Sequence, residues 1–474
     1  MLFSSLTFLF SFLPCLLLLY FIVPRRFIKL KNMILLVFSL CFYAWGEPKY
    51  IILMLGTVLI SYLFGLAIHT YGEKGQKQKQ RFAFVLSVIA VLSSLAYFKY
   101  MNFLLANVSF VLPFDFKTTN IILPIGISFY TFQILSYLID LYRGKLKVQK
   151  NFFHLALYIS FFPQLIAGPI VQYETIEDQL MNRKESFDKV INGLERFIIG
   201  LGKKVIIANQ TAVIADAIYN SQTLNNYSSL VYIVGMLAYT FQIYFDFSGY
   251  SDMAIGLGKI FGFEFLENFN YPYIANSVTE FWRRWHISLT TFFREYLYIP
   301  LGGNRVSKGK WVRNMLVVWL LTGLWHGAAW NFILWGLYYF ILLYLEKTIL
   351  KEPLKKLPNA VKYILTFIIV NIGWLLFRVN DLADAGTVLK GIVTNQGEIG
   401  LTGLCNENPA VIFALIFCIA APLFMTDLGH KIHQRYEKQA WYQLLRKGTL
   451  LGIFVICIMF LVSSTYNPFI YFRF

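Results

Sequence analysis

A succession of long apolar segments, separated by short basic runs, constrains this chain more than any other feature of its sequence. Apolar stretches recur from residue 5 to residue 464, and many approach the ~20 residues that a helix needs to cross a bilayer. Hydrophobic residues make up 57% of the 474 residues and charged residues 14%, against averages of ~45–50% and ~25% in soluble domains. A single soluble core stops growing near ~250–300 residues. Lipid is therefore expected to cover the excess apolar surface, and a disordered chain, a collagen and a coiled coil are excluded.

The segments predict an all-α polytopic membrane protein with about 11–13 transmembrane or re-entrant helices. No linker or internal repeat interrupts the chain, so we expect one integral-membrane domain over residues 1–474. The expected segments lie at residues 5–23, 33–46, 50–69, 82–98, 100–113, 119–141, 152–172, 191–213, 228–247, 311–327, 329–346, 362–379, 409–426 and 448–464.

The net charge of +17 comes from basic runs that lie between apolar segments. This distribution is typical of the positive-inside rule and disfavours nucleic acid as a partner. If the runs are cytoplasmic, the tail 465–474 is extracytoplasmic and the run at 100–113 does not cross fully. The same rule requires an even number of crossings between residues 150 and 283. This region holds three good candidate segments and a poor one at 252–265, so one of these assignments must be wrong. The basic runs are Arg25–Lys31, Lys74–Arg81, Arg143–Lys150, Arg305–Arg313, Lys347–Lys362 and Lys431–Lys447.

His326 is the first candidate for chemistry because it interrupts an apolar run over residues 319–330. An ionisable side chain in such a run is costly and indicates function by default. Burial favours the neutral imidazole, which can accept a proton. The neighbouring Gly323 and Gly327 leave space for close helix packing or for a narrow ligand. The alternative is a structural histidine bonded to a nearby carbonyl.

A second histidine, His286, follows Arg283 and Arg284 in an aromatic stretch. The pattern fits a catalytic partner beside a phosphate-binding pair, because guanidinium groups bind phosphate in a bidentate way. It equally fits an aromatic anchor at the membrane interface, with arginines that only mark the cytoplasmic side. Residue spacing leaves both interpretations open.

Two carboxylates, Asp246 and Asp252, directly follow an apolar span. Buried carboxylates need partners, and nearby arginines are the expected ones. We interpret the two residues as architectural ion pairs, with a direct part in the site as the alternative.

Several chemistries have no motif in this chain. The sequence contains no P-loop, no GxGxxG, no GxSxG and no HExxH, so nucleotide hydrolysis, Rossmann redox chemistry and zinc proteolysis are not indicated. The five cysteines form no CxxC pair and no ligand spacing, so we expect neither a disulfide framework nor a metal site. One buried base with space around it favours group transfer.

Six strings taken together resemble the membrane-bound O-acyltransferase family, in the branch typified by the bacterial alginate O-acetylation protein. The resemblance runs through nearly the whole chain, and six strings in the same order are more specific than any one alone. The strings are LPIGISFYTFQ at 123–133, FPQLIAGPI at 162–170, QIYFDFSGYSDMA at 242–254, FWRRWHISL at 281–289, YIPLGGN at 298–304 and GLWHG at 323–327.

The resemblance implies helices around a central tunnel, with His326 as the embedded catalytic histidine and His286 as the second motif histidine. Trp325 and Asn304 lie in matching strings and are expected to join the two arginines in binding the donor. It further implies acetyl-CoA, or another acyl thioester, as donor substrate, with no bound cofactor. A base at the narrowest point of the tunnel would contribute ~10²–10⁴ in rate, and excluding water would prevent wasteful hydrolysis of the donor.

The tail YNPFIYFRF at 466–474 is aromatic and almost uncharged, unlike the usual polar terminus. It resembles the C-terminal motif of a small membrane peptide of D-alanylation systems, which implies that Tyr471 is an acyl relay. A phenol with a pKa near ~10 needs an adjacent base before it can attack. The alternative is a hydrophobic docking tail whose tyrosine only forms a hydrogen bond.

The members most similar to this chain imply a multi-pass enzyme of the bacterial inner or plasma membrane. Its expected activity is O-acetylation of an exported polysaccharide or cell-wall glycan, with an extracytoplasmic acetyltransferase as partner and the glycan as a direct or indirect acceptor. The alternatives are D-alanyl, lipid or protein acyl transfer on the same fold. A polytopic transporter is the alternative from another class, but transporters usually show internal repeats, and none is visible.

Overall fold

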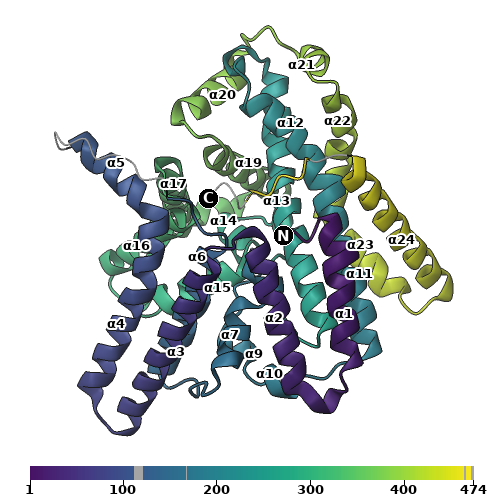
Figure 1. The fold of residues 1–474 in the computed structure, drawn as a ribbon. Helices are drawn as coiled ribbons and strands as arrows, with labels where there is room; N and C mark the ends of the chain where they lie inside the picture. The colour runs from purple at the N-terminus through teal and green to yellow at the C-terminus, as the bar shows by residue number, and fades with distance from the viewer. Residues whose placement is uncertain (112–120, 167, 464–465, 471–474) are drawn as a thin grey trace. The chain divides into compact units, whose positions relative to one another are not determined.

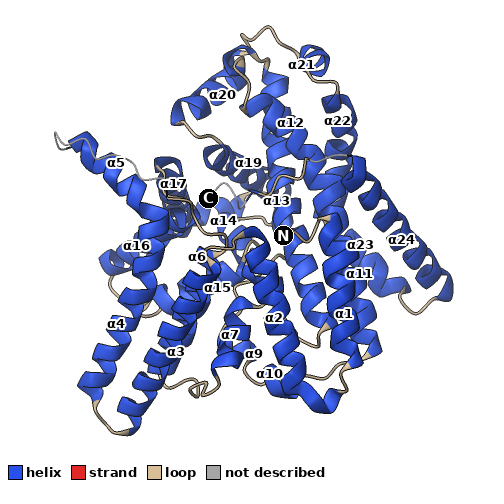
Figure 2. Ribbon diagram, in the orientation of Figure 1, coloured by secondary structure: helices blue, strands red, loops and turns tan. Residues whose placement is uncertain are grey.

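The structure, a computed structural model, describes residues 1–111, 121–166, 168–463 and 466–470. All the long elements in these residues are helices, as Figure 2 shows, which confirms the all-α prediction. Seven helices are long and apolar enough to cross a membrane, or eight if one bent helix pair forms a single span. The shorter apolar helices fall outside this number, so the prediction of about 11–13 membrane segments stays a prediction.

Contacts between residues divide the chain into two compact units, whose elements can be followed by number in Figure 1. Unit 1 comprises Met1–Phe197 and Met253–Leu266, and unit 2 comprises Ile198–Asp252 and Glu267–Phe474. The division rests on contacts alone, so the single domain expected over residues 1–474 also stays a prediction.

Unit 1 is built from apolar helices connected by short turns. Its elements are η1 (Phe8–Phe12), α1 (Leu13–Ile22), η2 (Arg25–Phe27), α2 (Ile28–Gly46), α3 (Ile51–Glu73), α4 (Lys77–Leu95), η3 (Ala96–Tyr100), α5 (Met101–Val111), α6 (Ile127–Tyr142), α7 (Phe152–Ser160), α8 (Phe162–Leu165), α9 (Tyr173–Ile176), α10 (Gln179–Asn182) and most of α11 (Phe187–Gly202).

Unit 2 contains both candidate histidines. Its elements are η4 (Lys203–Ala208), α12 (Asn209–Tyr219), η5 (Leu224–Asn226), most of α13 (Ser229–Ile260), η6 (Pro272–Ile274), α14 (Val278–Arg284), α15 (Ile287–Phe293), η7 (Arg294–Tyr298), α16 (Lys308–His326), α17 (Trp330–Lys347), α18 (Lys351–Lys356), α19 (Asn359–Arg378), α20 (Leu382–Thr394), α21 (Leu401–Glu407), α22 (Ala410–Ala420), η8 (Ala421–Met425), α23 (Leu428–Tyr436) and α24 (Ala440–Ser463).

The helix boundaries resolve the expected membrane crossings between residues 150 and 283. The candidate at 152–172 breaks at Phe161, just before Pro163, which lacks the N–H that would continue the helix. Its pieces α7 and α8, of nine and four residues, are ~14 and ~6 Å long, short of the ~30 Å hydrocarbon core. The poor candidate at 252–265 belongs mostly to α13. Two long spans remain between residues 150 and 283, Phe187–Tyr219 and Ser229–Ile260. Two crossings agree with the even number that the charge pattern requires.

The expected segments at 82–98 and 100–113 also need correction. They belong to one continuous helical stretch, Lys77–Phe110, of 34 residues. The run that begins at residue 100 therefore does not start a second crossing, in agreement with the charge pattern. No side chain with helix-breaking character separates the two segments, so their hydropathy alone suggested two helices.

Glycines allow α16 and α17 to approach closely at the end that carries His326. A Cβ on Gly323 would lie 2.2 Å from the backbone oxygen of Phe332, and one on Gly336 would lie 2.4 Å from the oxygen of Trp319. A Cβ on Gly327 would meet the Phe332 ring at 2.2 Å. Close helix packing therefore occupies the space that these glycines provide, as one of the two alternatives predicted.

Candidate active site

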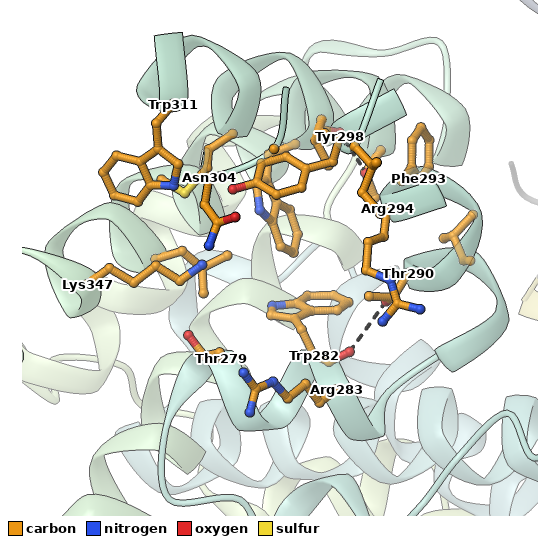
Figure 3. A pocket seen from close by; sticks show the side chains of 18 of the residues that line it. Thr279, Trp282, Arg283, Thr290, Phe293, Arg294, Tyr298, Asn304, Trp311 and Lys347 are labelled. Atoms are coloured by element: carbon orange, nitrogen blue, oxygen red, sulfur yellow. Dashed lines mark hydrogen bonds between the residues drawn. The ribbon is translucent and has the colours of Figure 1, made fainter. Parts of the chain in front are cut away.

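A cavity of about 990 Å³ lies in unit 2 and is lined by α14, α15, η7, α16, α17 and the loop that follows η7, as Figure 3 shows. Its volume is at the upper end of the ~300–1,000 Å³ typical of small-molecule sites. None of the described residues that line it is Asp or Glu, so the site favours an anion. Its cationic lining residues are Arg283, Arg294, Lys308 and Lys347.

Both candidate histidines line this cavity although they are forty residues apart in the sequence. The Trp325 ring contacts both, with centroid distances of 6.0 Å to His286 and 5.0 Å to His326. Trp325 therefore bridges the two imidazoles. It is not among the residues that line the large cavity, so its expected part in donor binding stays a prediction.

His326, the last residue of α16, lies at the junction of two cavities. Its buried ring packs edge-on against Trp335 and Phe377, each at 5.1 Å. It lines the large cavity and also a second one of about 10 Å³, which is the space of roughly one water. The arrangement places an imidazole between a wide cavity and a narrow one that has room for roughly one water.

The backbone holds His286 in an unusual conformation. Its φ of 43° and ψ of 56° lie in the left-handed region, which residues other than glycine adopt rarely and at a cost of ~1–3 kcal/mol. The residue separates α14 from α15 and is 1% exposed. Such strain persists only where surrounding contacts determine the conformation, and Asn268 supplies them.

Asn268 binds the segment around His286 through its side chain and its backbone. Its Oδ1 accepts hydrogen bonds from the Ser288 backbone N–H at 3.1 Å and the Ser288 hydroxyl at 2.9 Å, and it lies 3.2 Å from His286 Nδ1. Its backbone oxygen accepts from the Ile287 N–H at 2.9 Å. An amide oxygen only accepts, so Nδ1 of the imidazole carries the hydrogen and Nε2 is the nitrogen able to take a proton. Burial lowers the pKa of His286 to about 3, which keeps the imidazole neutral.

The two predicted donor-binding arginines have different environments. Arg283 is exposed and lines the cavity, as Figure 3 shows. Arg284 instead donates to Glu280 Oε1 at 2.8 and 2.9 Å and to the Asn270 backbone oxygen at 3.2 Å, and it does not line the cavity. The structure thus separates a guanidinium that faces the cavity from one engaged in local structure.

The N-terminus of α14 and the loop after η7 are both fixed to long helices. The Glu346 carboxylate, on α17, accepts from the backbone N–H groups of Val278 at 2.7 Å and Thr279 at 3.2 Å. Asn314, on α16, donates to two backbone oxygens of the loop, at 3.1 and 3.2 Å. The predicted donor residue Asn304 follows those oxygens in the loop and lines the cavity, as Figure 3 shows.

The carboxylates Asp246 and Asp252 pair with lysines of η4. Lys204 Nζ lies 2.7 Å from Asp246 Oδ1, and Lys203 Nζ lies 2.7 Å from Asp252 Oδ2. The arginine partners expected from the sequence are therefore wrong for these ion pairs. The two lysines belong to η4 and the two carboxylates to α13. Helix packing, and not distance along the chain, therefore decides which cation pairs with each carboxylate.

The remaining points concern the tail tyrosine, a metal site and two residues that the sequence did not indicate. Tyr471 lies outside the described residues, so its relay role stays a prediction. No group of three His, Cys, Asp or Glu side chains that could hold a metal lies in the part of the chain that the structure describes. Asn268 and Lys204 were not among the predicted site residues. The sequence offers no spacing rule that links Asn268 to a histidine 18 residues later.

Comparison with known proteins assigns the class. Residues 40–379 match the membrane-bound O-acyltransferase family, and the chain belongs to this family. It is a multi-pass membrane acyltransferase.

Three relatives illustrate the range of names in this family. The probable alginate O-acetylase of Pseudomonas putida is 39% identical over 495 aligned positions, which cover all of both chains. The peptidoglycan O-acetyltransferase of Helicobacter pylori is 36% identical over 527 positions, covering 100% of this chain and 98% of the relative. The teichoic acid D-alanyltransferase of Bacillus subtilis is 31% identical over 330 positions, 66% of this chain and 82% of the relative.

Asn268→Asp should make acyl transfer sensitive to pH between 5 and 8. In the native protein burial lowers the pKa of His286 to about 3, so this group does not titrate in that range. A carboxylate in place of the amide raises the pKa of the imidazole, so that the inactive protonated form grows as the pH falls and the acid limb of the rate profile moves upward. A pH–rate profile in proteoliposomes measures the shift.

Two further variants complete this experiment. Asn268→Ala removes the acceptor of His286 Nδ1 and should lower transfer by ~10²-fold, the lower range for a positioned base. Ser288→Ala removes the hydroxyl that donates to Asn268 and lies 3.5 Å from His286 Nδ1, but it keeps the contact between Asn268 and His286 and adds no charge, so the acid limb of its pH profile should stay at the native position. A native-like profile for Asn268→Asp would contradict the positioning role.

Proposed function

We propose that this acyltransferase takes an acetyl group from a thioester on the cytoplasmic side and passes it across the membrane for O-acetylation of an exported polysaccharide or cell-wall glycan. The carrying observation is the position of His326 between a wide cavity with cationic lining residues and a narrow cavity. The names of the full-length relatives, an alginate O-acetylase and a peptidoglycan O-acetyltransferase, support the acetyl group and the glycan.

The wide cavity suits acetyl-CoA, or another acyl thioester, as the donor substrate. A phosphate-bearing donor is attracted by Arg283, Arg294, Lys308 and Lys347, because guanidinium and ammonium groups bind phosphate oxygens. The narrow end near His326 admits the small acetyl group and not the charged remainder of the donor. This division explains how the acyl group alone could pass while the donor stays on its own side.

His326 acts in this proposal as the general base of the transfer. An acceptor hydroxyl gives its proton to the imidazole as its oxygen attacks the thioester carbonyl carbon. The new C–O bond forms, the C–S bond breaks, and the departing thiolate takes the proton. The aromatic walls from Trp335 and Phe377 limit water at this position, so that the donor is not hydrolysed.

The acceptor side involves the tail and a partner protein. Ile470 lines the narrow cavity together with His326, and the next residue in the sequence is Tyr471. Its phenol is the proposed relay that receives the acetyl group and passes it to an extracytoplasmic acetyltransferase, which completes transfer to the glycan. The proposed location is the bacterial cytoplasmic membrane, in keeping with the basic runs expected on its inner side.

His326→Ala should abolish acetyl transfer while the protein stays folded in the membrane. Loss of a positioned base lowers the rate by ~10²–10⁴-fold. The measurement is incorporation of radiolabelled acetyl groups into wall or capsule glycan by cells that contain each variant in equal amount. Near-native incorporation by His326→Ala would reject the general-base role. Native protein that transfers labelled D-alanine to teichoic acid, and no acetyl group to glycan, would replace the proposed substrates with those in the name of the Bacillus relative.

Arg283→Gln should raise the KM for the donor by ~10–100-fold, since a hydrogen bond to a charged group contributes ~1.5–3 kcal/mol. Arg284→Gln is the matched comparison, because its native partners are Glu280 and the Asn270 backbone. This variant should lower the amount of folded protein more than the donor affinity of the protein that folds. Initial rates against acetyl-CoA concentration, for purified protein in proteoliposomes, measure both variants. Equal KM values for Arg283→Gln and the native protein would remove Arg283 from the donor site.

Tyr471→Phe tests the relay because it keeps the ring and removes only the oxygen that would carry the acetyl group. Glycan acetylation in cells should then be lost, while the variant remains in the membrane at native levels. Tyr363→Phe, at an exposed tyrosine of α19 outside the tail, is the control and should retain acetylation. Native acetylation by Tyr471→Phe would leave the tail as a docking segment only.

A further inference from the structure

Residues 466–470 form a segment whose last two residues are buried, and neither the family match nor the relatives' names explain it. Phe469 and Ile470 are 5% and 4% exposed, and the Phe469 ring packs on Tyr250 at 5.1 Å. All these residues belong to unit 2. Buried backbone groups outside a helix need hydrogen-bond partners within the protein, so the partners of this segment indicate what holds it.

A buried ion pair holds the main chain of this segment at two points. Lys204 and Asp246 lie 2.7 Å apart, with side chains 3% and 1% exposed. Asp246 Oδ2 accepts from the Ile470 N–H at 2.9 Å, and Lys204 Nζ donates to the Pro468 backbone oxygen. The pair therefore supplies an acceptor and a donor to two backbone groups that would otherwise be buried without partners.

Local helix geometry brings this ion pair together. Lys204 lies in η4, a π-helical turn between α11 and α12, and such turns often occur at functional sites. A Cβ on Gly249 of α13 would lie 2.8 Å from the Gly200 backbone oxygen and 3.1 Å from the Lys204 backbone nitrogen. The glycine thus permits the close approach that aligns Lys204 with Asp246.

A second anchor fixes the start of the segment. Tyr466 donates to Asp216 Oδ2 at 2.5 Å, and Arg378 donates to the other oxygen of the same carboxylate at 2.8 Å. Between the two anchors, Asn209 donates to the Asn467 side chain at 3.1 Å. The segment is thus held along its length by side chains of α12, η4 and α13, and Arg378 of α19 binds the Asp216 carboxylate.

Ile470 places this anchored segment at the reaction cavity. Its side chain lines the cavity of about 10 Å³ with His326, Trp285 and Phe377. This cavity holds no more than roughly one water, whereas the cavity that His326 also lines on the donor side has a volume of about 990 Å³. Ile470 therefore closes the narrow end.

We propose that Lys204 and Asp246 are positioning residues that clamp the main chain of residues 468–470, so that Ile470 seals the narrow side of the cavity at His326 against water. The clamp thus limits the access of water to the acyl donor from the narrow side. Its charges are paired with each other and with backbone groups, so it does not itself react.

The consequence for chemistry rests on the proposed function. When the seal opens, water reaches the thioester carbonyl, its oxygen attacks the carbonyl carbon, and the C–S bond breaks. The products are the free carboxylic acid and the thiol, with the proton of water ending on sulfur. Loss of the clamp therefore converts productive transfer into hydrolysis of the donor.

Chemical labelling tests the seal without reference to any donor. In protein carrying Ile470→Cys, a small water-soluble thiosulfonate should modify position 470 slowly. Adding Lys204→Met and Asp246→Leu, which leave neither a donor nor an acceptor, should raise the labelling rate several-fold, measured by mass spectrometry of the tail peptide. The control carries Lys203→Met and Asp252→Leu, at the neighbouring, partly exposed ion pair of the same helical segments, and should label as slowly as the parent. Fast labelling in the parent, or equal rates in all three proteins, would reject the clamp.

Donor hydrolysis tests the consequence. With full-length protein in proteoliposomes and acetyl-CoA as probe, the Lys204/Asp246 variant should release free thiol several-fold faster than native protein while glycan acetylation falls. Ile470→Gly, which keeps the clamp and removes the sealing side chain, should show the same change and guards against misfolding of the first variant. Unchanged hydrolysis in Ile470→Gly would reject the seal. If native protein transfers no acetyl group, the proposed donor is wrong, whereas the labelling result still decides the clamp.

Discussion

Polar groups at membrane depth must find their partners within the chain, and unit 2 is arranged around that constraint. Lys204 and Asp246 neutralise each other and bind the backbone of the tail segment. Arg378 pairs with Asp216. The surroundings of the two histidines are different, because aromatic rings pack against both imidazoles. Charge is thus satisfied within these buried pairs, and burial lowers the pKa of His286, which favours its neutral form.

The sequence was sufficient to predict the helical class, part of the topology and four of the residues that line the cavity, namely Arg283, His286, Asn304 and His326. Each depends on a property that a single residue or segment carries by itself. His326 is conspicuous because it interrupts an apolar run, and hydropathy identifies a span whatever its neighbours are. Where hydropathy failed, at 152–172, one proline divided an apolar stretch into pieces too short to cross. Arg283 and Arg284 show the limit of this approach, because adjacent residues of the same type have different environments.

Asn268, Lys204 and Gly249 could not be predicted because their parts depend on packing between segments distant in the sequence. An asparagine in a polar loop has many possible partners, and only the folded chain brings its Oδ1 to three groups at His286 and Ser288. The lysine partners of Asp246 and Asp252 depend on a π-helical turn and on a glycine that lets two helices approach. Neither feature has a period in the sequence that would reveal the contact.

The conformation of His286 connects these packing details to chemistry. A left-handed histidine costs free energy, and the Asn268 contacts with His286, Ile287 and Ser288 offset that cost before any substrate binds. The same contacts select the Nδ1–H tautomer of His286. An imidazole whose orientation is already fixed loses little entropy beside the reacting groups. Part of the free energy of folding therefore offsets the strained backbone of His286, and this conformation places the imidazole at the cavity that both histidines line.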